Sequence, residues 1–161
     1  MPKTRYLCLM TRSEVVILQE PALDPGALDE VRSILSQMGI VYREETLPAL
    51  PSLAALHRLA ESVSQSVCIV CAGRSAHVLP TLAASISPQQ PLIIMPCPGP
   101  NAPETYLDTV FDAMRGYPVA YTRPFDAQGA ALLAVHLLVG RHPSYADILS
   151  AFVQKKYLQP A

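Results

Sequence analysis

The residues best suited to chemistry stand in one short run, Ala72-Gly73-Arg74-Ser75-Ala76-His77, which directly follows the apolar stretch Val67–Cys71. An apolar run that ends in small and polar residues is typical of a buried strand that delivers a loop to the start of a helix. Such a loop suits an anion, because glycine lets the backbone approach closely and exposed N–H groups favour negative charge. Arg74, Ser75 and His77 would add side-chain donors. The alternative is a tight strand-to-helix turn in which Ser75 is an ordinary N-cap.

A second candidate is the cysteine pair Cys68 and Cys71, whose spacing is that of a metal or redox site. The pair lies in the predicted strand, where residues three apart point to opposite faces of the sheet. The two sulfur atoms would therefore diverge. We expect small buried thiols in a reducing compartment, and no metal site.

The composition narrows the class of protein. The chain has 161 residues, of which half are apolar and 16% are charged, and its net charge is −1. This length predicts a single domain with a hydrophobic core. The low fraction of charged residues favours burial of apolar surface by self-association. The Lys and Arg residues are scattered without interleaved aromatic residues, which argues against nucleic acid as a partner. We see no membrane span and no signal peptide, and so expect a cytoplasmic protein.

The elements that must position the loop alternate between strands and helices. The predicted strands cover Glu14–Leu18, Ile40–Glu45, Val67–Cys71, Pro91–Met95 and Pro118–Thr122. The first helix starts at an Asp24 N-cap with Pro25 in its first position and stops at Gly39, and later helices cover Ser52–Val63, His77–Ile86, Glu104–Arg115, Ala127–Val139 and Pro143–Lys156. This alternation, with strands interpreted as apolar core strands, predicts an α/β fold whose parallel sheet is covered on both faces.

Two apolar helices near the end of the chain carry further predictions. His136 lies among leucines and is expected to be a core or interface histidine. The last helix carries an apolar stripe that should pack on its own subunit or on a neighbour, namely Tyr145, Ile148, Leu149, Phe152 and Val153. The segment Arg5–Met10 has its own strand pattern, so we interpret residues 1–13 as an N-terminal extension to a domain of residues 14–161.

With this order of elements in place, the chain from about Val15 to Lys156 resembles one family of purine biosynthesis, the PurE-like carboxyaminoimidazole ribonucleotide mutases and aminoimidazole ribonucleotide carboxylases. Ala72-Gly73-Arg74-Ser75 matches the carboxylase branch, whereas Ala76-His77 with Leu79-Pro80 looks more like the bacterial mutase branch. Asp24, Leu59–Ser62 and Gly129–Ala134 fall into the same register. The resemblance implies a flavodoxin-like three-layer α/β/α sandwich, a homo-octamer with sites between subunits, and chemistry without a metal or organic cofactor.

Two family motifs are missing from this chain. Where the family has Gly-Ser-x-Ser-Asp after its first strand, this sequence has Glu20-Pro21-Ala22-Leu23-Asp24. Where the family has Ser-Ala-His after its second strand, it has Pro48-Ala49-Leu50. Leucine cannot move a proton, Glu20 would place negative charge near the expected phosphate, and Pro21 removes a backbone N–H.

Two hypotheses follow from the resemblance and its gaps. In the first, the chain is a divergent carboxylase or mutase with impaired standard catalysis. His77 would then replace the missing histidine, and a phosphorylated ribonucleotide would contact Asp24, Ala72, Gly73, Arg74, Ser75 and Ala76. In the second, the chain is a pseudoenzyme that serves as an oligomeric binding or scaffold protein. The sequence leaves open whether a separate synthetase chain is a partner.

Overall fold

The computed structural model describes residues 13–47, 52–86 and 90–158. A five-stranded parallel sheet with strand order β2-β1-β3-β4-β5 forms the centre of the molecule. Its strands are β1 (Val15–Gln19), β2 (Tyr42–Thr46), β3 (Val67–Ala72), β4 (Leu92–Pro96) and β5 (Ala120–Tyr121). The predicted segment Arg5–Met10 and the position of Leu50 lie outside the described residues.

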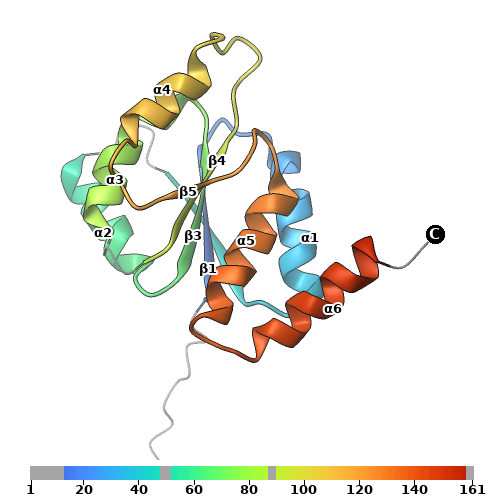
Figure 1. Ribbon diagram of the computed structural model, residues 1–161. Coiled ribbons are helices and arrows are strands. Elements are labelled where there is room, and N and C mark those ends of the chain that lie inside the picture. Colours follow the sequence, from blue (N-terminus) through green and yellow to red (C-terminus); the bar gives the residue numbers. More distant parts are fainter. Residues whose placement is uncertain (1–12, 48–51, 87–89, 159–161) are drawn as a thin grey trace, which may run out of the picture.

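Helices cover both faces of this sheet, as expected for a flavodoxin-like sandwich (Figure 1). One face carries α1 (Asp29–Gln37), α5 (Ala127–Val139) and α6 (Tyr145–Tyr157). The other face carries α2 (Leu53–Ser62), α3 (Leu79–Ser85) and α4 (Tyr106–Ala113). Two short 3₁₀ helices, η1 (Pro25–Leu28) and η2 (Arg74–Val78), precede α1 and α3.

The central strands follow from runs of β-branched and apolar residues. All of β3 and β4 is buried, and the first four residues of β1 are buried as well. Side chains alternate between the two faces, so that Ile17 packs towards α1 and α5 while Leu18 packs towards α2. The same alternation separates Cys68 from Cys71, as predicted, because the two residues belong to opposite halves of the core.

The second strand differs from its prediction. We expected a core strand over Ile40–Glu45, but β2 lies at the edge of the sheet and none of its residues is buried. Among the described strands, β1 is the one with which it pairs. The Arg32 guanidinium donates hydrogen bonds to Glu44 on this strand, at 2.7 and 2.9 Å.

Two helix starts also differ from prediction in detail. Asp24 caps the chain as expected, since its carboxylate accepts from the Gly26 N–H at 3.1 Å, but the first turn is the 3₁₀ helix η1. The helix ends before Gly39, whose φ of 69° suits glycine. Similarly, the predicted helix over His77–Ile86 begins as η2 and becomes α-helical only at Leu79.

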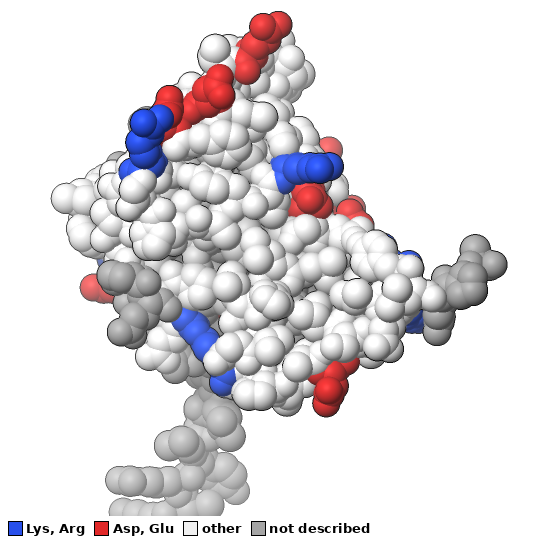
Figure 2. Space-filling view, in the orientation of Figure 1, with Lys and Arg blue, Asp and Glu red and all other residues white. Residues whose placement is uncertain are grey.

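The surface is sparsely charged, in keeping with the composition. On the face shown in Figure 2, Lys, Arg, Asp and Glu side chains stand singly or in small groups among uncharged residues. His136, predicted to lie in the core or an interface, is exposed on α5 of this single chain, so the core alternative is wrong. The stripe on α6 packs partly on its own subunit, through Tyr145, Leu149 and Phe152. No helix in the described ranges has the length and apolarity required to span a membrane.

Candidate functional site

The carboxyl ends of β1 and β3 meet in the middle of the sheet. The connections from these two neighbouring strands run to opposite faces, because α1 follows towards one layer and α3 towards the other. In open parallel sheets this topological switch point is where ligands bind. Glu20 comes directly after β1 and Gly73 directly after β3, so both lie at this point.

The Glu20 carboxylate is bound to the loop that the sequence marks as an anion site. One of its oxygens accepts from the Gly73 N–H at 2.7 Å and the other accepts from the Arg74 N–H at 2.9 Å. Glu20 is 7% exposed, the lowest exposure of any described acidic residue. The loop therefore does hold an anion, and that anion is a side chain of the same molecule.

A side chain at position 73 would crowd this contact. A Cβ atom built there would lie 2.9 Å from Glu20 Oε2 and 3.2 Å from the backbone oxygen of Cys97. Real Cβ contacts of 2.9 Å are essentially absent from proteins, so a side chain would force the carboxylate or the loop to move. The role expected of Gly73, close approach of the backbone to an anion, is met by Glu20.

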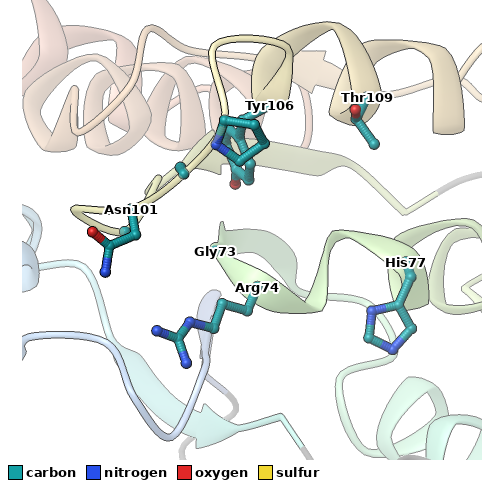
Figure 3. A pocket seen from close by; sticks show the side chains of 9 residues that line it. Gly73, Arg74, His77, Asn101, Tyr106 and Thr109 are labelled. Carbon is teal, nitrogen blue, oxygen red and sulfur yellow. The ribbon is translucent and has the colours of Figure 1, made fainter.

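A cavity of about 360 Å³ opens beside the loop (Figure 3). Gly73, Arg74 and His77 line one side, and residues of the β4–α4 connection and α4 line the other. In Figure 3 the Arg74 and His77 side chains extend from η2 in different directions. The opposite wall consists of Gly99, Asn101, Ala102, Pro103, Tyr106 and Thr109. Two basic side chains, one amide and two hydroxyl groups thus surround a space of small-molecule size.

Tyr106 joins the two walls of this cavity. Its hydroxyl donates a hydrogen bond to the carbonyl of Ala72, the last residue of β3. The same carbonyl accepts from the Cys97 N–H at 2.6 Å. Burial, first, and nearby negative charge, including that of Glu20, raise the pKa of Tyr106 to about 12. The hydroxyl therefore stays protonated and acts as a donor throughout the physiological range.

The cysteines near the site are not activated nucleophiles. Cys71 and Cys97 are both buried beneath the loop. A hydrogen bond to Cys97, followed by burial, raises the pKa of the Cys71 thiol far above its ordinary value. Burial likewise raises the pKa of Cys68 to about 12. A thiol attacks or binds metal as the thiolate, so Cys68 and Cys71 behave as small apolar side chains. No group of three or more His, Cys, Asp or Glu suited to a metal ion occurs in the described ranges.

The structure brings some of the predicted site residues together and leaves others apart. Gly73, Arg74 and His77 line one cavity. Ala72 is buried and contributes its carbonyl. Asp24 is exposed, caps η1 and does not line the cavity. The backbone of Ser75 and Ala76 lies in η2, while their side chains are outside what the structure describes.

Sequence reasoning missed the far wall of the cavity. The rigid loop rich in proline after β4 carries no catalytic signature, and the position of Asn101, Tyr106 and Thr109 opposite Gly73 depends on tertiary packing. A signal did exist for Tyr106, because a tyrosine in the first turn of a helix next to a predicted loop site can supply a hydroxyl donor. Thr109 follows one helical turn later and shares its face.

Comparison with known proteins is consistent with this architecture. A family model described as AIR carboxylase matches residues 14–158. The crystal structure of Treponema denticola PurE superposes with a TM-score of 0.73 at 19% identity, covering 88% of this chain and 89% of that one. A crystal structure of a substituted Treponema denticola PurE gives the same values. At this identity the structures establish the fold alone. A search among curated proteins finds no match.

Proposed function

This chain belongs to the AIR carboxylase family, and from that premise we propose that it is a divergent member whose standard carboxyl transfer is impaired. In this proposal the protein retains a small-molecule site at the carboxyl end of its sheet. The single observation that carries the proposal is the Glu20 carboxylate on the Gly73 and Arg74 N–H groups.

Glu20 interferes with the binding step of the family reaction. A phosphorylated ribonucleotide, the ligand that the resemblance implies, would have to displace a nearly buried carboxylate before its phosphate could reach these donors. Two unit charges of like sign about 4 Å apart repel by about 4 kcal/mol near a protein surface. Pro21, directly after Glu20, also has no N–H to offer.

The chemical step is weakened independently. Leu50 stands where the family resemblance places a histidine that moves a proton, and loss of a positioned acid or base removes about 10²–10⁴ in rate. The resemblance implies chemistry that depends only on positioning and proton transfer. The rate losses from weaker phosphate binding and from the missing acid–base group therefore multiply. Among the described residues that line the cavity, His77 is the histidine that could replace it, and its side chain is exposed.

The cavity itself supports a retained binding function. Its volume is within the range of small-ligand sites, and its basic side chains favour an anionic or strongly polar compound. Among the described residues, neither Arg74 nor His77 forms a salt bridge. Both are therefore available to a ligand.

We propose, in addition, that the chain assembles into a homo-oligomer, with the octamer of the family as the expected form. The low charge content supports this, as do partly exposed apolar side chains on the last helix, including Ile148 and Tyr157. Assembly would place copies of the cavity near one another and could complete each site with residues of a neighbour.

The proposal is tested by assaying aminoimidazole ribonucleotide and its carboxylated form in both directions by absorbance. We expect the turnover of both compounds to be very weak or absent. Because His77 lies in the same cavity as Arg74, the competing candidate function is an active carboxylase or mutase with His77 as acid–base group. Robust turnover that is lost in His77→Ala and retained in His57→Ala, a surface control, would overturn the proposal in favour of that candidate.

A further inference from the structure

We propose that Glu20 is the specificity-determining residue of this site and excludes phosphoryl groups from it. The inference rests on the proposed function, because it states which ligands the retained cavity accepts. Those ligands are small compounds that carry no phosphoryl group at the loop and bind through Arg74 and the far wall of the cavity.

The carboxylate occupies the donors as an external anion would. Its two oxygens accept from two consecutive backbone N–H groups, at 2.7 and 2.9 Å. Consecutive N–H groups at a turn after a strand are the groups that hold phosphate oxygens in other sites. Both donors are satisfied at short distance, so a phosphate gains nothing from the loop unless Glu20 leaves.

The backbone around Glu20 holds the carboxylate in place. Glu20 continues directly from the buried strand β1, and its carbonyl accepts from the Leu23 N–H at 3.1 Å, closing a tight turn. Pro21, the second residue of that turn, has its φ fixed by the proline ring. On the loop side, Gly73 provides the space that the carboxylate fills, with Oε2 only 2.9 Å from the ideal Cβ position. Glu20 and Gly73 thus fit one another, which distinguishes this contact from a chance surface hydrogen bond.

Charge strengthens the exclusion. A carboxylate is singly negative, whereas phosphate approaches two negative charges at neutral pH, so a phosphate beside a seated Glu20 meets strong repulsion. Arg74 and His77, the basic side chains that line the cavity, leave η2 in different directions (Figure 3). A ligand with a single carboxylate or a neutral polar group can pair with Arg74 from the cavity without contacting those donors.

The test uses inorganic phosphate as the probe and three forms of the full chain: the wild type, Glu20→Ala and Glu20→Asp. Binding is followed by calorimetry and by melting temperature at matched ionic strength. Glu20→Ala frees both the space and the donors, and is expected to bind phosphate with a dissociation constant of about 1 mM. At 10 mM phosphate its melting temperature should rise by about 3–5 °C. The wild type should show no rise, and Glu20→Asp, which keeps the charge, should show none either.

Two results would overturn the inference: equal phosphate binding by the wild type and Glu20→Ala, or no binding by a Glu20→Ala protein that is folded by circular dichroism. Should Glu20→Ala not fold, Glu20→Gln takes its place. Its amide keeps the size of the side chain but cannot accept from both N–H groups. Phosphate should therefore displace the glutamine side chain from the loop donors in this variant, but should not displace Glu20 in the wild type. Turnover of ribonucleotides is a separate readout, and its presence would contradict the proposed function without deciding whether Glu20 blocks the loop.

Discussion

The contact between Glu20 and Gly73 makes a quantitative prediction about stability. Glu20→Ala removes one hydrogen bond to the buried Gly73 N–H and one to the partly buried Arg74 N–H. A hydrogen bond to a charged group contributes about 1.5–3 kcal/mol, and water can rehydrate the more exposed of the two donors. We therefore expect the free energy of unfolding to fall by about 2–3 kcal/mol.

Gly73→Ala should be costly for the same geometric reason. The added Cβ would lie 2.9 Å from Glu20 Oε2 and 3.2 Å from the Cys97 carbonyl oxygen, and overpacking of this kind costs about 1–3 kcal/mol. In a Glu20→Ala background the closer of these contacts is gone. Gly73 does not have a positive φ, so alanine there would also lower the conformational entropy of the unfolded chain, which stabilises the fold by about 0.4–1 kcal/mol. In that background, Gly73→Ala should leave the free energy of unfolding almost unchanged.

The assay is a double-mutant cycle by urea denaturation at one fixed protein concentration, because assembly links stability to concentration. We expect a coupling free energy of about 1–2 kcal/mol between the two positions. Gly99→Ala is the matched control, since a Cβ at Gly99 meets nothing within 4 Å, and it should be neutral and additive with Glu20→Ala. Additive effects of Glu20→Ala and Gly73→Ala would refute the reasoning from the 2.9 Å contact.

Three further predictions concern the elements around the site. Tyr106→Phe should lower the free energy of unfolding by only about 0.5–1 kcal/mol, because the Ala72 carbonyl keeps its bond from the Cys97 N–H, and a loss above 3 kcal/mol in urea denaturation would contradict this. The hydrogen bond from Arg32 lowers the pKa of Glu44 from its ordinary 4.5, so it stabilises the fold above that pH and its contribution is lost on acidification. In Arg32→Ala the melting temperature should therefore fall less between pH 5 and pH 3 than it does in the wild type. An equal fall in both proteins would show that the ion pair does not contribute. Light scattering should find an oligomer, and a stable monomer at micromolar concentration would exclude the proposed assembly.

Much of the fold was predictable because local signals and tertiary packing agree. Asp24 followed by Pro25 marks a helix start in any context, and the long apolar helix Ala127–Val139 has the predicted bounds. The buried strand before Gly73 was equally plain, since its β-branched run has one interpretation in a chain that alternates strands with helices. The edge position of β2 was missed, although the flavodoxin-like strand order that the resemblance implies places the second strand at an edge, and the charged run Arg43-Glu44-Glu45 is typical of an edge strand.

The site was predictable only on the side of the loop. The residue types of the run from Ala72 to His77 identify it as a candidate anion site, and the sequence also indicated that Glu20 would bring negative charge to it. That both Glu20 oxygens bind consecutive N–H groups depends on the relative placement of β1 and β3, which residue types do not encode. The wall that includes Tyr106 depends in the same way on the path of the loop after β4.

The occupancy of the loop donors can be observed directly through the Gly73 amide. The chain has seven glycines, so ¹⁵N-glycine labelling gives few resonances, and Gly73→Ala identifies the one of interest. If Glu20 holds this N–H, titration of the wild type with inorganic phosphate leaves the Gly73 resonance in place, while the same titration of Glu20→Ala shifts it to saturation. A saturable shift of the Gly73 resonance in the wild type, equal to that in Glu20→Ala, would show that phosphate reaches the loop and that Glu20 does not close it.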